Sequence, residues 1–166
     1  MSDAQARHAQ YAQAKSAAVR LLAGRARTRA DLETRLRGKG LAPEAIDEAL
    51  GDLQRAGYID DEQYARDRIE ALLRGSRRGA VALVHALTGD GLAADLAERI
   101  VAERLEGEDS GAWALEAARA RAGSLRGLDE ETARRRLYGY LKRRGFADAE
   151  ALRAVDEALS APDGDD

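Results

Sequence analysis

One short pattern occurs three times along the chain and constrains the fold more than any other feature. A glycine is followed by an apolar residue at Gly40-Leu41, Gly91-Leu92 and Gly145-Phe146. One leucine lies four residues before each glycine and another lies eight residues before it, which is the spacing of a buried helical stripe. A glycine in this place ends a helix in the left-handed conformation, and the apolar residue after it packs back onto the helix. The copies lie 51 and 54 residues apart and predict one helical module repeated three times.

The residues between these turns supply start signals for further helices. Thr28 suits the N-cap of one helix, and Pro43 suits the first turn of the next. Asp60 and Asp129 can cap later helices in the same way, and so can either Asp109 or Ser110 at the start of the third module. Each module therefore has room for three helices.

The junction between the first two modules is the segment Gly57-Tyr58-Ile59-Asp60-Asp61-Glu62-Gln63-Tyr64-Ala65. Its glycine can end one helix and its first aspartate can begin the next, so almost no linker remains. We expect the two modules to meet at a fixed angle. Apolar residues near helix ends and along the helical stripes should face inward, among them Tyr58, Val81 and Leu152.

Composition agrees with an all-α fold. The 166 residues are 45% hydrophobic, only 4% are aromatic, and the chain has two prolines. Such an alanine-, leucine- and charge-rich chain favours helix, and it has no run of alternating β-branched residues. We predict three tandem three-helix repeats forming an elongated, curved array. The repeats cover residues 15–59, 60–107 and 108–160, after an N-terminal extension at 1–14 and before a disordered acidic tail at 161–166.

Several classes of protein are disfavoured. The chain has no cysteine, so disulfides and thiolate metal sites are impossible. No apolar run reaches about 18 residues and no signal-peptide core is present, which predicts a cytoplasmic protein. A net charge of −3 argues against a globally basic nucleic-acid binder. His8 and His85 form no catalytic or metal set, and no nucleophile–base pair or phosphate loop is visible, so we predict no enzyme activity and no cofactor.

Three basic clusters are the candidate contact sites for a partner. Guanidinium and ammonium groups on a solvated helix face can meet phosphates or carboxylates. The alternative is a solubilising surface paired with neighbouring acids such as Asp129 and Glu131. The candidate residues are Arg35, Arg37 and Lys39, then Arg74, Arg77 and Arg78, then Arg135, Arg136, Lys142 and Arg143.

Three aromatic residues have two interpretations. Tyr138 and Tyr140 lie beside the third basic cluster and could stack on bases, or they could pack with a wet hydroxyl. Trp113 is interpreted as an anchor of the third core.

Four segments together resemble the RecX family of regulatory proteins. They are the Thr28-Arg29-Ala30-Asp31-Leu32 helix start, the Lys39-Gly40-Leu41 turn, the Gly57–Ala65 junction and the closing Arg144-Gly145-Phe146. The resemblance covers roughly residues 15–159. It implies tandem three-helix repeats and a bacterial protein that binds the RecA recombinase on single-stranded DNA. It also implies that such a protein lies along the filament groove and restrains recombinase and coprotease activities.

The second module departs from the family pattern. Family members usually end this helix with a basic residue before the glycine, whereas this chain has Asp90. A carboxylate there opposes the helix dipole, while Lys39 and Arg144 complement it at the other two turns. The charge contacts of the middle module are therefore in doubt.

The sequence supports one leading hypothesis and two alternatives. The leading one is a monomeric regulator that binds the RecA filament and the single-stranded DNA within it, with at most weak direct DNA binding. A helix-turn-helix DNA reader is the second, although Glu44, Asp47, Asp148 and Glu150 lie where such a protein needs base- or phosphate-contacting residues. A general helical scaffold for protein partners is the third.

Overall fold

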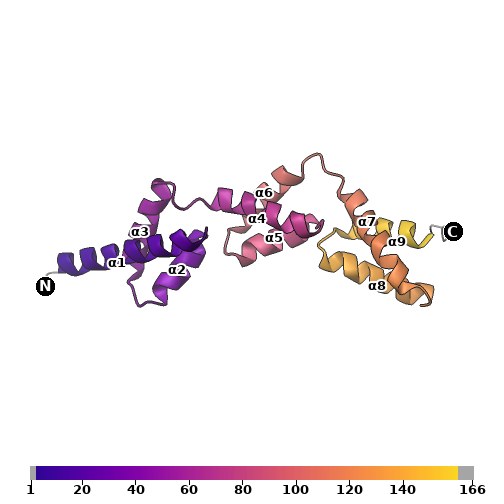
Figure 1. Ribbon diagram of the computed structural model, residues 1–166, viewed down its shortest axis with the longest axis horizontal. Helices are drawn as coiled ribbons and strands as arrows, with labels where there is room; N and C mark the ends of the chain where they lie inside the picture. Colours follow the sequence, from indigo (N-terminus) through magenta and orange to yellow (C-terminus); the bar gives the residue numbers. More distant parts are fainter. Residues whose placement is uncertain (1–2, 161–166) are drawn as a thin grey trace. The chain divides into compact units, whose positions relative to one another are not determined.

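The computed structural model describes residues 3–160, and the predicted acidic tail at 161–166 lies outside the described residues. Within residues 3–160 the chain forms α-helices, one 3-10 helix and no strand (Figure 1). The helices are α1 (Asp3–Gly24), α2 (Arg29–Arg37), α3 (Pro43–Arg55), α4 (Asp61–Gly75), α5 (Ala80–Gly89), α6 (Ala94–Leu105), α7 (Ser110–Ala122), η1 (Gly123–Leu125), α8 (Glu130–Arg143) and α9 (Asp148–Ser160). The all-α prediction with three successive three-helix repeats is confirmed.

The chain is organised into two compact units. Unit 1 comprises residues 1–67 and 87–97, and unit 2 comprises residues 68–86 and 98–166. Unit 1 thus contains the whole first repeat and unit 2 the whole third repeat. The predicted domain boundaries at residues 59/60 and 107/108 stay a prediction. None of the helices within residues 3–160 has the length and hydrophobicity that a membrane span requires.

In unit 1, helices α1, α2 and α3 enclose a core of alanine, leucine and isoleucine. Its buried members are Ala17, Ala18, Leu32, Leu36, Ile46, Leu50, Leu53 and Ile59. Helix α2 begins as predicted, because the Thr28 hydroxyl accepts a hydrogen bond from the Asp31 N–H at 3.1 Å. Pro43 is the first residue of α3, where its missing N–H costs nothing.

The N-terminal segment continues helix α1 back to Asp3 and is tied to α3. The Tyr11 hydroxyl donates to Asp52, and Lys15 Nζ contacts the same carboxylate at 3.3 Å. The Gln10 side-chain oxygen accepts from the Ala42 N–H at 2.9 Å, just before α3 begins. The part of the segment from Gln10 to Ala14 is therefore in contact with the rest of the first repeat, and Ala14 is fully buried.

In unit 2, helices α7, α8 and α9 form the second core, which Figure 1 shows in orange to yellow. Phe146, Leu137 and Leu141 are fully buried, and Trp113 is 7% exposed, which confirms its predicted role as a core anchor. Helices α7 and α9 both contribute small buried residues to this core, namely Ala114, Ala117 and Ala118 from α7 and Ala151 and Ala154 from α9. Asp129 caps α8 as predicted, and of the two candidates Asp109 and Ser110 it is Asp109 that caps α7.

The three turn glycines behave as the repeated pattern predicts. Gly40, Gly91 and Gly145 have φ values of 77°, 92° and 82°. Only glycine adopts this region without a steric cost. The apolar residue after each glycine lies in or against the core: Leu92 is 5% exposed and Phe146 is fully buried.

Three apolar residues expected to face inward do not. Tyr58 is 67% exposed, Val81 is 58% exposed and Leu152 is 49% exposed. After Gly57 only Ile59 turns back into the core, at 2% exposed. Along α9 the buried face consists of Ala151, Ala154 and Val155, which leaves Leu152 outside.

Within unit 1 a joint forms where the start of α2 meets the turn that precedes α6. The Thr28 hydroxyl donates to the Asp90 carbonyl at 2.8 Å. A Cβ placed on Gly91 would lie 2.8 Å from Cβ of Ala30. The Tyr64 hydroxyl contacts the Asp90 carboxylate at 3.2 Å.

Unit 2 contains a corresponding joint, in which the start of α5 meets the turn that precedes α9. The Gly79 N–H donates to the Arg144 carbonyl at 2.9 Å, and the Val81 N–H donates to the Gly145 carbonyl at 3.2 Å. A Cβ on Gly79 would lie 2.1 Å from the Gly145 oxygen, and a Cβ on Gly145 would lie 2.2 Å from the Ala82 nitrogen. In both joints the residue before a second helix hydrogen-bonds the carbonyl that precedes a turn glycine.

Candidate functional site

Four arginines of unit 2 line a recess between the end of α7 and one face of α8. We call it the arginine pocket; its volume is about 410 Å³. Its lining residues are Arg121, Ser124, Leu125, Arg135, Arg136, Gly139, Tyr140 and Arg143.

Two elements position these side chains. Arg135, Arg136, Gly139 and Arg143 lie on one face of α8, because residues three, four and seven apart are neighbours on a helix. Arg121 comes from the last turn of α7, and the adjoining η1 helix is held by buried Leu125, at 6% exposed. The Ser124 hydroxyl donates to the Arg121 carbonyl at 2.8 Å and fixes the backbone at this end of the pocket.

The pocket carries four guanidinium groups and no carboxylate in its lining. Among residues 3–160, the ion pairs of the structure include none made by Arg121, Arg135, Arg136 or Arg143. The pKa of Asp129, at the start of α8, is lowered mainly because the Thr132 N–H donates to it, and the charge of Arg135 acts in the same direction.

Gly139 forms part of the lining of the arginine pocket. A Cβ at this position would lie 3.3 Å from Arg143 Nη1, so the guanidinium of Arg143 occupies space that a side chain would take. Glycine in the middle of a helix lowers the stability of the helix by roughly 1 kcal/mol relative to alanine. The space that Gly139 leaves for the Arg143 guanidinium is a structural reason for glycine at this position.

Tyr140 is held by cations of the protein itself. Its hydroxyl accepts a hydrogen bond from Arg144 Nη1 at 2.7 Å, and the guanidinium carbons of Arg121 and Arg144 lie 5.8 and 5.5 Å from its ring centroid. The Tyr138 hydroxyl donates to the Asp148 carboxylate at 2.7 Å. Both hydroxyls therefore have partners, and base stacking by these rings stays a prediction.

Lys142 lies outside the pocket lining, although the sequence grouped it with the arginines of α8. It pairs with Asp148 at 2.7 Å and donates to the Phe146 carbonyl at 3.1 Å. The hydrogen bond between Lys142 and Asp148 raises the pKa of the lysine and lowers the pKa of the carboxylate. Lys142 thus joins α8 to the start of α9.

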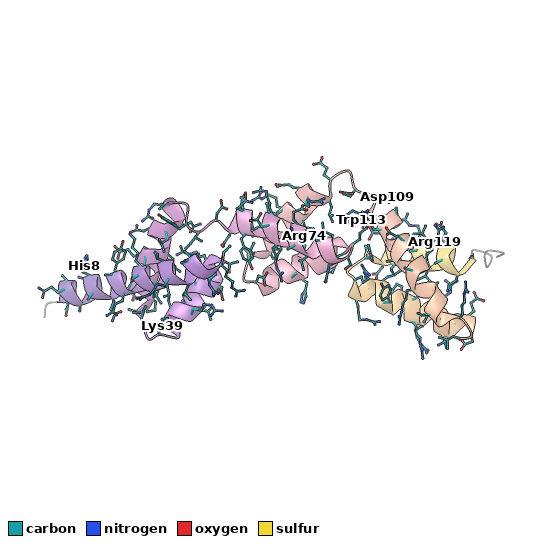
Figure 2. The ribbon with its side chains drawn as sticks, in the orientation of Figure 1. His8, Lys39, Arg74, Asp109, Trp113 and Arg119 are labelled. Atoms are coloured by element: carbon teal, nitrogen blue, oxygen red, sulfur yellow. The ribbon has the colours of Figure 1, made fainter. Side chains whose placement is uncertain are left out.

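The cluster on α2 is largely paired within its own helix. Arg35 contacts Asp31 at 2.9 Å, and Arg37 contacts Glu33 at 2.5 Å. Partial burial opposes ionisation of Asp31, but hydrogen bonds from Arg27 and Arg35 outweigh it and lower its pKa. Lys39 is exposed at the turn after α2, as Figure 2 shows, and makes no ion pair with a described residue.

The second predicted cluster, between α4 and α5, is divided. Arg74 and Arg77 line a second recess of about 320 Å³ together with Trp113, Arg104 and two carboxylates. The Arg77 guanidinium lies 4.7 Å from a ring centroid of Trp113. Arg78 does not line this recess, and its Nε is buried without a hydrogen-bond partner among the described residues.

Four lining residues of the arginine pocket were not predicted from the sequence, namely Arg121, Ser124, Leu125 and Gly139. Arg121 belongs to a different helix from the other three arginines, so no spacing rule links them. Gly139 could have been identified from the sequence, because an isolated glycine within a helical pattern usually has a packing or functional reason. Among residues 3–160 no group of three or more histidine, cysteine, aspartate or glutamate side chains could hold a metal ion.

Comparisons with known proteins address the family. Residues 14–53 match the family model described as RecX, first three-helix domain. The regulatory protein RecX of Amycolatopsis mediterranei is 35% identical over 149 residues, which is 90% of this chain and 85% of that protein. Its counterpart in Streptomyces coelicolor is 36% identical over 148 residues, covering 89% and 78% of the two chains.

Solved structures show the same fold. The crystal structure of RecX from Lactobacillus salivarius has a TM-score of 0.77 at 19% identity and covers 92% of this chain and 98% of that one. A second RecX crystal structure has the same TM-score at 20% identity, covering 92% of this chain and 75% of that one. Sequence identity above 30% along nine-tenths of the chain, together with the shared fold, shows that this protein belongs to the RecX family of regulatory proteins.

Proposed function

We propose that the chain binds the filament that RecA forms on single-stranded DNA and inhibits its recombinase and coprotease activities. The observation that carries this proposal is the match to regulatory proteins named RecX along about 90% of the chain. The role of RecA as the partner comes from the family. In this proposal the protein acts in the cytoplasm as a monomer, through the basic clusters of its three repeats.

The binding mechanism we infer is avidity. Exposed charge pairs contribute about 0.2–1 kcal/mol each, so no single basic cluster would hold a filament. Several weak contacts made by one chain add up, because the second contact forms at a high effective concentration. Partly free guanidinium groups, such as those of the arginine pocket, support this role better than Arg35 and Arg37, which already have carboxylate partners.

The decisive experiment measures RecA-catalysed strand exchange and DNA-dependent ATP hydrolysis with increasing amounts of this protein at low salt. We expect inhibition at substoichiometric amounts, weakening as salt screens the contacts. No effect at any ratio would reject the proposal.

Charge reversal tests the contribution of the third repeat. Replacing Arg135, Arg136 and Arg143 together by glutamate should weaken binding to the filament while leaving helicity unchanged, since all three side chains are exposed. Unchanged filament affinity would mean that this face of α8 is only solvated.

A further inference from the structure

We propose that the arginine pocket is a phosphate site that takes the backbone of a single nucleic-acid strand. This inference rests on the proposed function and deepens it, because it assigns one basic cluster to the strand rather than to the recombinase. It requires direct binding to a bare strand, which the proposed function does not.

The first argument is the contrast between the pocket and its surroundings. Neighbouring arginines of the same repeat have carboxylate partners: Arg119 contacts Glu157 at 2.9 Å, and Arg134 contacts Asp156. The four pocket arginines share one recess without a carboxylate. Because like charges repel, a bound anion stabilises this arrangement by relieving the repulsion.

The second argument concerns the type of anion. Guanidinium groups form charge-assisted, often bidentate hydrogen bonds with phosphate oxygens. Arg136 and Arg143 are separated by about 10 Å along the axis of α8, from the rise of a helix per residue. One isolated phosphate is too small to serve both ends of this row, whereas a strand offers one phosphate at every nucleotide.

The third argument is shape. A recess of about 410 Å³ has the size of a small-ligand pocket, and its concave wall places donors from α7 and α8 around one ligand. A groove with positive walls that follows the backbone is how proteins hold single strands without reading their sequence. A duplex reader would instead need a helix that projects into a groove.

The test measures binding of a fluorescently labelled oligothymidine to the full chain without recombinase, by anisotropy over a series of salt concentrations. The triple variant R135Q/R136Q/R143Q should flatten the dependence of log affinity on log salt by about 2, since each single-strand phosphate contact contributes about 0.7. The matched control is R153Q, which removes one exposed arginine of the same repeat outside the pocket. It should leave the salt slope close to that of the unaltered chain.

A second variant keeps all the charges. Gly139→Leu adds a side chain to the pocket lining next to Arg143 Nη1, and leucine favours the helical conformation. We expect its affinity for the strand to fall several-fold with helicity and thermal midpoint preserved. Wild-type affinity in this variant would overturn the proposal, because it would show that diffuse charge rather than a shaped site binds the strand.

Competition identifies the ligand chemistry. Tripolyphosphate should displace the strand at lower concentration than polyglutamate of equal total charge. Displacement by polyglutamate alone would overturn the phosphate assignment in favour of a carboxylate-bearing protein partner, and so would an unchanged salt slope in the triple variant. Absence of strand binding at low salt would overturn it as well.

The two proposals fail separately. If the chain inhibits RecA but its binding to bare oligothymidine does not respond to the pocket variants, the phosphate site is rejected and the proposed function stands. If the chain binds oligothymidine through the pocket and never inhibits RecA, the proposed function is rejected and the site stands.

Discussion

Replacing Gly145 by alanine tests whether the joint in unit 2 depends on a missing side chain. Gly145 has a φ of 82°, and a Cβ there would lie 2.2 Å from the Ala82 nitrogen and 2.3 Å from its Cβ. The atoms that a new Cβ would overlap belong to the helix α5 at Ala82, so they cannot move aside as the end of a flexible side chain could. We therefore expect a loss of stability from two sources, the backbone conformation and the overlap.

Gly40 provides the matched control, because it separates these two sources. Its φ of 77° is nearly the same, but nothing lies within 4 Å of a Cβ added to it. Alanine in the left-handed conformation costs about 1–2 kcal/mol. Overpacking a filled site costs about 1–3 kcal/mol more, so Gly145→Ala should lose roughly 2–5 kcal/mol and Gly40→Ala about 1–2 kcal/mol.

Thermal denaturation followed by far-ultraviolet circular dichroism measures the difference. For a chain of this size 1 kcal/mol corresponds to about 2–4 °C, so the midpoint of Gly145→Ala should lie about 2–12 °C below that of Gly40→Ala. Amide hydrogen exchange should place the loss of protection for Gly145→Ala in unit 2. Equal midpoints for the two variants would refute the role assigned to the close backbone contact.

Three further outcomes follow from single side chains. Thr28→Ala should cost about 1–3 kcal/mol by urea denaturation, because it removes a buried cap that also donates to the Asp90 carbonyl, and Thr28→Ser should restore most of it. The pKa of Asp52 is lowered to about 2 by hydrogen bonds from Tyr11, Arg55 and Lys15, so its stabilising effect is full above pH 3.8 and is lost as pH falls towards 2. A carboxyl titration by nuclear magnetic resonance should find that pKa, and a value near 3.8 would contradict the contact. Phe146→Ala should cost about 3–5 kcal/mol, whereas Tyr58→Ala should stay within about 0.5 kcal/mol, since the first side chain is fully buried and the second is 67% exposed.

Local signals made the helices predictable from the sequence. Thr28, Pro43, Asp60 and Asp129 start helices in the structure because their capping or backbone preferences act within one turn. The turn glycines were predictable for the same reason. These features depend on neighbours in the chain and not on the rest of the fold.

The apolar residues that were wrongly predicted to face inward are exposed because of how the helices pack against one another. Large apolar side chains at helical spacing usually mark the buried face of a helix, whereas the buried faces of α7 and α9 consist mainly of alanines, and Leu152 lies outside the buried face of α9. At the start of α5 the Val81 N–H is used by the Gly145 carbonyl, and the small residue Ala82 faces the turn. Neither arrangement can be read from the periodicity of one helix.

The candidate site was predictable in part. Arg135, Arg136 and Arg143 share a face of α8 by helical spacing alone. The contribution of Arg121 and the engagement of Lys142 with Asp148 depend on how α7 and α9 pack against α8. Sequence spacing could not supply either.

The two joints use main-chain donors and acceptors with glycines or small side chains at the points of closest approach. Such contacts require glycine or a small side chain at a few positions. They do not depend on which side chains occupy most other positions. A substitution that keeps these few positions small therefore leaves both joints intact, even where it changes the charge of the surface.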